Sequence, residues 1–205
     1  KLLTMSALIL SFVLAITAVR NLPFIDFRAY KVGVNIPRNM QPSAALEYSY
    51  VMKKGEELVT FDQYPSDESL EFVEMNLKNP DALPKISDFA VWNDEGDFSE
   101  EVFTGNKVLI LVSSMAKISE VNLEQIDQLV KSLSGSPVQP VFVAAASQDE
   151  IQNFTSTWGW DVLSLQADAT VVKTMIRSNP GIMILKDGEV MAKYHHNNTP
   201  EATDV

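Results

Sequence analysis

The chain has 205 residues, 46% of them hydrophobic, and carries a net charge of −11 at neutral pH. That length allows one core-forming domain with additional segments, and an acidic chain without a basic stripe is not expected to bind nucleic acid. The sequence contains no cysteine. Disulfides, thiolate metal ligands and thiol redox chemistry are therefore excluded for this chain.

An uncharged apolar stretch, Leu2–Val19, lies between Lys1 and Arg20. As a helix it would extend ~27 Å, which just crosses the hydrocarbon core of a bilayer. A signal peptide is the alternative, but the stretch is long for one and no A-x-A cleavage site ends it. We therefore predict a transmembrane helix over residues 1–20.

Small residues recur every four positions on one face of this helix, at Ala7, Ser11 and Ala15. Such spacing lets helices approach closely in lipid, although small residues are also common in these helices by chance. We expect this face to pack against further membrane spans that precede Lys1. The cations after the helix, taken alone, favour a cytoplasmic location for the rest of the chain: Arg20, Arg28, Lys31 and Arg38.

Residues 21–84 are predicted to form a membrane-proximal collar and a β-hairpin region. The segment Asn21–Met40 is rich in aromatic residues and interrupted by prolines, which indicates an irregular collar near the membrane surface. In ALEYSYVMKKGEELVTF, alternating large residues lead to a turn at Lys54-Gly55 and return through Leu58–Phe61. The spacing of Leu70, Val73 and Leu77 then favours a helix before residue 79.

From Pro80 onward, apolar runs alternate with helical periods, which is typical of α/β layers. Strands are predicted at 88–92, 107–113, 138–145, 162–165, 181–186 and 190–194. Two helix starts have capping signals, because Ser147 with Glu150 fits a capping box and Asp168 fits an N-cap.

No cofactor or metal site is predicted. His195 and His196 are adjacent, and on a strand such side chains point apart, so we expect a solvated loop or an edge contact there. Ser113 and Ser114 end a predicted strand but lie outside any G-x-S-x-G nucleophile motif. No catalytic constellation is recognisable, and we expect the chain not to be an enzyme.

Three stretches, ISDFAVWNDEG, NKVLILVSS and IRSNPGIMILKDGEV, resemble the thioredoxin-like family over residues 85–194. The resemblance implies an α/β fold for residues 85–205, with a thioredoxin-like central mixed sheet flanked by helices. It also implies that Pro180 is the family's cis-proline. Without the resemblance a trans bond would be favoured, because only about 5–6% of X–Pro bonds are cis.

The family's C-x-x-C motif would fall near Ile118-Ser119-Glu120-Val121, where this chain has no thiol. Disulfide exchange requires a thiolate, so this domain is expected to be redox-silent. Apart from redox chemistry, the family resemblance implies a peptide-binding groove, in which the backbone beside the cis-proline pairs with an extended peptide. Its candidate residues are Asn179, Pro180, Met115, Ile118, Ser119 and Val121. The alternative is a groove that is hydrated or filled by the chain's own hairpin.

Nearly the whole chain, with its span, NLPFIDFRAYKVGVNIP, IRSNPG and HHN, resembles the C-terminal portion of bacterial DoxX-type membrane proteins. This resemblance implies several preceding spans, the bacterial inner membrane and a periplasmic soluble domain, against the local charge count. The expected function is a membrane-tethered binding or structural module, with the bilayer and an extended peptide or protein as partners. The alternative is the substrate-presenting part of a redox enzyme whose thiols lie in upstream spans.

Overall fold

The computed structural model describes residues 2–205. The chain divides into two compact units, one of residues 38–87 and one of the segments on either side of it. The larger unit therefore joins the segment up to Pro37 with Asp88–Val205. This differs from the predicted boundaries, because the first part of the collar belongs with the α/β unit.

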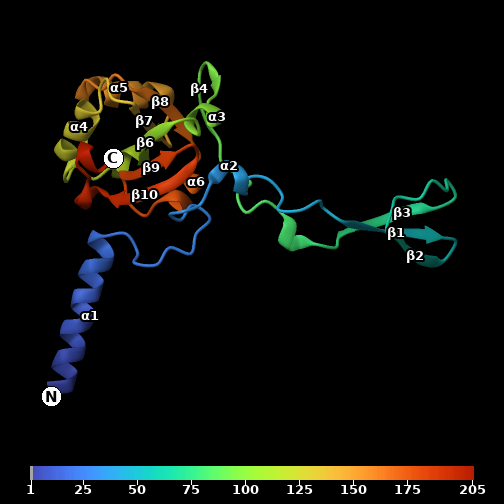
Figure 1. Cartoon of the computed structure of the whole chain (residues 1–205). Coiled ribbons are helices and arrows are strands. Elements are labelled where there is room, and N and C mark those ends of the chain that lie inside the picture. Colours follow the sequence, from blue (N-terminus) through green and yellow to red (C-terminus); the bar gives the residue numbers. More distant parts are fainter. Residues whose placement is uncertain (1) are drawn as a thin grey trace. The chain divides into compact units, whose positions relative to one another are not determined.

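A seven-stranded mixed sheet organises the larger unit, in the order β10-β9-β6-β7-β8-β4-β5 (Figure 1). Its centre is parallel, since β6 pairs with β7 and β7 with β8, whereas β9, β10 and β4 run antiparallel to their neighbours. The strands are β4 (Val91–Asn93), β5 (Gly96–Asp97), β6 (Asn106–Val112), β7 (Val138–Ala144), β8 (Leu163–Ala167), β9 (Gly181–Lys186) and β10 (Glu189–His195). The predicted mixed α/β architecture is confirmed.

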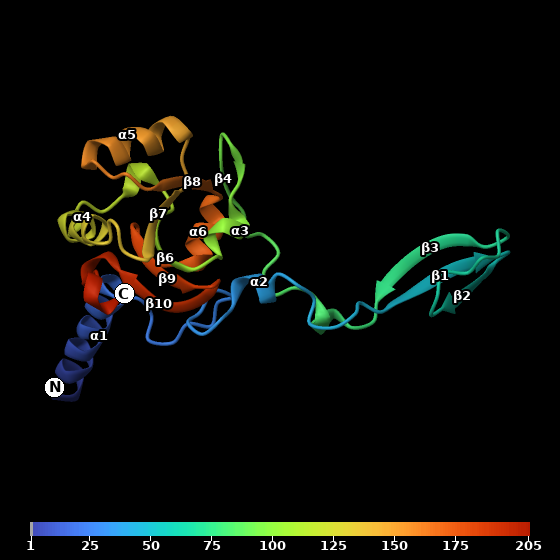
Figure 2. The same ribbon diagram turned by 45° about the horizontal axis from the view of Figure 1, so that its top comes forward.

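Helices cover both faces of this sheet (Figure 2). Alternate residues of β6, such as Val108 and Ile110, are buried in one cluster with the apolar faces of α4 and α5. The residues between them, including Leu109, point to the opposite face of the sheet, because successive strand side chains alternate. They are also fully buried, which shows that this second face is covered as well. The helices of this unit are α3 (Ser99–Val102), α4 (Leu123–Ser132), α5 (Gln148–Trp158) and α6 (Ala169–Met175).

The two predicted helix caps are present. Ser147 and Glu150 form a reciprocal capping box at α5, and the Asp168 carboxylate accepts hydrogen bonds from the N–H groups of Thr170 and Val171 at α6. These bonds satisfy donors that would otherwise be unpaired at a helix start.

The smaller unit is a three-stranded antiparallel sheet in the order β2-β1-β3. The predicted hairpin forms from β1 (Tyr48–Lys54) and β2 (Glu57–Phe61). The helix predicted around Leu70–Leu77 is wrong, because Glu71–Leu77 is strand β3, paired with β1. Leu70, Val73 and Leu77 have helical spacing, but the pairing edge that β1 offers decides the structure of this segment.

The N-terminal helix α1 (Leu2–Arg20) is long and apolar enough to cross a membrane. Its window Leu3–Arg20 has a mean hydropathy of 2.0 and is not buried against the rest of the protein. The predicted packing residues Ala7, Ser11 and Ala15 are all exposed, and the Ser11 hydroxyl donates to the Leu8 carbonyl of its own helix. Packing of this face against other spans remains a prediction.

The collar between α1 and Pro37 runs along β10 at the edge of the sheet. The N–H of Gly33 donates to the carbonyl of Val190, and the N–H of Val190 donates to the carbonyl of Val34. Tyr30 is buried, and its hydroxyl bonds the Asp88 carboxylate. Burial, with the Asp88 charge, raises the pKa of Tyr30. These contacts hold the residues after α1 on the α/β unit.

Candidate functional site

The candidate site lies where two loops meet at the end of β6. In sheets with parallel strands, functional residues gather at the carboxyl ends of the strands. Strand β6 ends at Val112, and its residue Leu111 pairs with Gly181 at the start of β9. The loop before β9 therefore lies beside the loop after β6. The Asn179–Pro180 peptide bond in this loop is cis.

The Asn179 side chain ties these two loops together. Its Oδ1 accepts hydrogen bonds from the backbone N–H groups of Ser113 (2.8 Å) and Ser114 (3.3 Å), and its Nδ2 donates to the Ser114 carbonyl at 2.8 Å. One amide side chain thus satisfies three backbone groups, as a strand partner would do. An amide fits this place because it both accepts and donates.

The backbone of Asn179 is also engaged. The N–H of Ser119 donates to the Asn179 carbonyl at 2.8 Å. The structure thus brings together Asn179 and Ser119, two residues of the predicted groove. However, the carbonyl that was expected to pair with an incoming strand already has a partner within the chain.

The other predicted groove residues have different surroundings. Pro180 is buried, Met115 and Ile118 pack half-buried against the core, and Val121 is exposed. Residues 118–121, where the family's C-x-x-C motif would fall, lie in the loop before α4, which begins at Leu123. Asn122 is the N-cap, with a left-handed φ of 64° that an asparagine tolerates well.

A shallow depression of about 500 Å³ adjoins Asn179 on the side of α6. It shares Asn179 and Ser113 with the loops just described, but not Met115, Ile118, Ser119 or Val121. Two exposed cations, Lys173 and Arg177, border it on a chain whose net charge is −11. The remaining lining residues are Ile176, Ser178 and His195.

Gly181, which follows Pro180, is required by close packing. A Cβ atom on Gly181 would lie 2.6 Å from Cδ1 of Ile176, and two further atoms of that side chain would be closer than 3.0 Å. Ile176 is itself buried, so it has little room to move. The Pro-Gly pair at the start of β9 therefore allows Ile176 to pack under this loop.

The adjacent histidines do not form a solvated loop, and they do not point apart. Strand β10 ends at His195 and the 3-10 turn η3 (His196–Asn198) follows, which brings the two ring centroids within 4.1 Å. His195 is only 6% exposed. The backbone N–H of His196 donates to Ser178 Oγ at 3.0 Å, and His196 Nδ1 lies 2.9 Å from the same oxygen.

The hydrogen bonds assign the proton positions on both rings. The Ser178 hydroxyl donates to the Pro180 carbonyl, so its oxygen is an acceptor toward His196 Nδ1–H. His195 Nδ1 accepts from the N–H of Asn197 at 3.2 Å, which leaves the proton of the neutral ring on Nε2. Ser178 is therefore not an activated nucleophile in this arrangement, since its hydroxyl proton is already committed to a carbonyl.

Both histidines are held in their neutral form. Burial lowers the pKa of His195, and the neighbouring His196 lowers it further. Burial also lowers the pKa of His196, although the Pro180 carbonyl acts in the opposite direction. Since the unfolded chain binds these protons more tightly, stability is present above about pH 6.5 and is lost as the pH falls through the lowered pKa values.

We therefore expect the melting temperature of the full chain in detergent to fall between pH 7.5 and pH 5.5. The Asp168 carboxylate, whose pKa its bonds to Thr170 and Val171 lower, titrates below this window. Replacing both histidines by glutamine should flatten the pH dependence, whatever the replacement does to stability itself. A wild-type chain that is equally stable at the two pH values would contradict this account of the histidines.

The turn after His195 also connects the site to the end of α1. Asn197 Nδ2 donates to the Arg20 carbonyl at 3.0 Å, which is one of the carbonyls left unpaired at a helix C-terminus. Its Oδ1 accepts from Asn122 Nδ2 at 3.3 Å, beside α4. This role of Asn197 could not be predicted from the sequence, where its only signal is the run of polar residues His-His-Asn-Asn.

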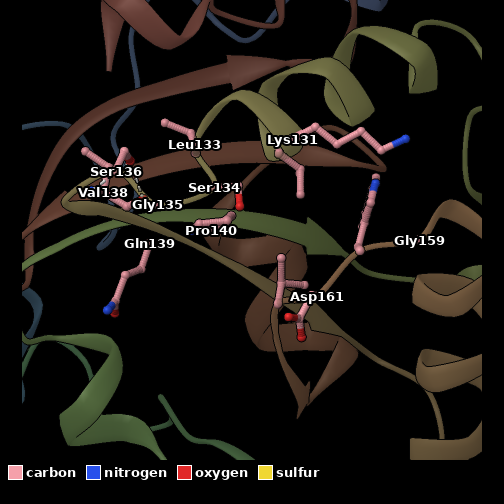
Figure 3. A pocket seen from close by; sticks show the side chains of 13 residues that line it. Lys131, Leu133, Ser134, Gly135, Ser136, Val138, Gln139, Pro140, Gly159 and Asp161 are labelled. Carbon is pink, nitrogen blue, oxygen red and sulfur yellow. Dashed lines mark hydrogen bonds between the residues drawn. The ribbon is translucent and has the colours of Figure 1, made fainter.

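A second depression, of about 480 Å³, lies at the opposite end of the parallel strands (Figure 3). It is bordered by the segment from Ser134 to Pro140, which leads into β7, and by Gly159 to Val162 before β8. Lys131 at its rim is paired with Asp127 at 2.9 Å. This depression is lined by residues at the amino ends of the strands, where α/β sheets rarely bind ligands, so we do not consider it the candidate site. Across residues 2–205, no cluster of three potential metal ligands occurs.

Comparisons with known proteins find similarity in structure only. No family model matches the sequence, and no curated protein matches it. A thioredoxin-like protein from Aeropyrum pernix has 13% identity and a TM-score of 0.45 over 57% of this chain and 84% of its own. A thiol:disulfide interchange protein from Chlorobium tepidum has 15% identity and a TM-score of 0.39 over 52% and 81%. ScoI of Arabidopsis thaliana, solved with copper bound, has 12% identity and a TM-score of 0.41 over 57% and 90%.

At these identities a likeness concerns the fold and leaves activity open. The sheet combines a parallel centre with the antiparallel β9–β10 hairpin, which agrees with the predicted central mixed sheet flanked by helices. Residues 88–205 thus form a mixed α/β sheet flanked by helices, and the solved structures similar to this chain include a thioredoxin-like protein.

Proposed function

We propose that this chain is a membrane-tethered, redox-silent thioredoxin-like module that binds or supports another polypeptide in a DoxX-type membrane protein. The observation that carries the proposal is the cysteine-free loop at residues 118–121, where the family resemblance places the thiols and where the Ser119 N–H is bonded to the Asn179 carbonyl. A bacterial inner membrane, with the module on the periplasmic side, is part of this proposal. The proposal also includes that the chain has no enzymatic activity of its own.

The surface beside Asn179 supports a binding role. The depression there is open, and Lys173 and Arg177 give it positive charge on an acidic chain. Opposite charges across an interface guide association and orient a partner. We therefore infer that the partner segment is an extended peptide with carboxylate side chains. It binds at this depression and not at the part of the predicted groove that runs from Met115 to Val121.

Photocrosslinking in native membranes tests this role. A photoreactive residue at Lys173 is expected to label a discrete polypeptide, and one at Ser134, exposed at the other end of the strands, is expected not to. In addition, the pure chain in detergent is expected to reduce a disulfide substrate no faster than buffer. Equal labelling at both positions would exclude the binding role, and measurable turnover would exclude redox silence. If the labelled polypeptide itself carries redox-active thiols, the alternative is favoured, in which this chain presents the substrate of a redox enzyme.

A further inference from the structure

The residues just after α1 have an unusual distribution of side chains. Phe24 and Phe27 are each 88% exposed, and Ile25 is 66% exposed. Single exposed apolar residues are common on soluble proteins, but contiguous ones mark a surface that contacts something apolar. We call Phe24, Ile25 and Phe27 the apolar wedge.

The charged residues within the same segment face the opposite way. Asp26 lies between Ile25 and Phe27, and its carboxylate bonds Lys193 Nζ at 2.6 Å and Arg28 Nε at 2.7 Å. The side chain of Lys193 on β10 is only 4% exposed, and those of Asp26 and Arg28 are each 19% exposed. The chain thus directs its charges onto the α/β unit and its large apolar side chains away from it, which is the reverse of an ordinary soluble surface.

The ionisation of Asp26 is consistent with this arrangement. Burial would raise its pKa, but the hydrogen bonds from Arg28 and Lys193 outweigh burial and hold it well below its usual range. The carboxylate stays charged, is matched by two cations, and adds no negative charge beside the wedge. Exposed Arg20 and Lys31 flank the segment instead.

The position of the wedge identifies the surface that it meets. Phe24 follows the end of α1 by four residues, so the chain between them spans at most ~14 Å. A bilayer that α1 crosses ends there in an interfacial layer several ångströms thick. Aromatic and aliphatic side chains insert readily into that layer, and cations beside them face the lipid phosphates.

We propose that the apolar wedge inserts into the interfacial layer of the bilayer crossed by α1 and seats the thioredoxin-like unit on the membrane surface. The inference rests on the membrane tether in the proposed function. It adds that the unit does not hang freely from α1, because the wedge forms a second attachment. The hydrogen bonds of Asn197 to Arg20 and of Asn198 to Asn21 hold the helix end against the same unit.

The absence of native cysteine makes a direct test simple. Single cysteines at Phe27, at Val13 within α1 and at Ser134 are labelled with an environment-sensitive fluorophore in the full chain. Each labelled protein is reconstituted into vesicles of phosphatidylcholine and phosphatidylglycerol, with and without lipids that carry a nitroxide quencher. Phe27 is exposed, so the replacement does not disturb the core.

We expect the labels at Val13 and Phe27 to emit at shorter wavelength in vesicles and to lose intensity with nitroxide lipid, while the label at Ser134 stays unquenched. Quenching at Val13 with a Phe27 label that behaves like Ser134 would overturn the wedge and leave the tether intact. Absence of quenching at Val13 would overturn the tether, and with it this inference.

Discussion

Replacing Lys193 by methionine is expected to lower the free energy of unfolding by about 3 kcal/mol. The ammonium group is almost fully buried and bonds both the Asp26 carboxylate and the Tyr30 carbonyl. Removing one partner of a buried ion pair typically costs ~3–5 kcal/mol, because the other charge is left without compensation. Asp26 keeps its bonds to Arg28, so the lower end of this range applies. Burial also lowers the pKa of Lys193, partly opposed by Asp26.

Lys131→Met is the matched control. Lys131 pairs with Asp127 one helical turn away, but its side chain is 58% exposed, and such pairs contribute only ~0.3–0.5 kcal/mol. Urea unfolding of the full chain in detergent, followed by tryptophan fluorescence, measures both variants. Trp160 lies in the core and reports loss of packing there. If the two substitutions cost the same, the Asp26–Lys193 pair does not hold the collar on β10.

Asn179→Ala is expected to lower the free energy of unfolding by about 2–3 kcal/mol. The substitution removes the acceptor for the N–H groups of Ser113 and Ser114 and the donor to the Ser114 carbonyl. Each backbone group left unpaired in a poorly hydrated place costs ~1–3 kcal/mol. These loops are half-buried, so water replaces some of the lost bonds.

Asn179→Asp separates the two functions of the amide. An aspartate retains an oxygen for the two N–H groups but cannot donate to the Ser114 carbonyl, so a cost of about 1 kcal/mol is expected. Asn153→Ala on the exposed surface of α5 is the control, with an expected effect within ~0.5 kcal/mol. The same unfolding measurement applies. An Asn179→Ala chain as stable as the Asn153→Ala chain would show that this side chain does not join the two loops.

Several elements could be predicted from local sequence alone. Strand β9 has the predicted bounds, and the capping box at Ser147 and the cap at Asp168 form as expected. The two caps depend on residues within a few positions of one another, and β9 is marked by a continuous apolar run directly after Pro180. The Glu71–Leu77 segment was predicted to be a helix but forms strand β3. Its local spacing does not show the strand, because the segment pairs with β1, about twenty residues earlier in the chain.

The candidate site was predictable only in outline. The family resemblance placed Asn179 opposite residues 118–121, and Ser119 does contact it. The pattern could not reveal that the Asn179 side chain would occupy backbone groups of the β6 loop, since those groups are about 65 residues away in sequence. Nor could it place His195 and His196, which are brought together by the end of β10 and by Ser178.

By itself the sequence determined the apolar N-terminal helix, the α/β layering and the absence of thiol chemistry, because each follows from composition or from short-range periodicity. Only the tertiary structure decided that the collar joins the α/β unit, that Asp26 and Arg28 turn inward to Lys193, and that the apolar wedge is left outside. The reason is that an irregular segment that mixes apolar and charged residues, such as Phe-Ile-Asp-Phe-Arg, can present either kind of side chain outward. A buried lysine on a strand 167 positions away fixes which one.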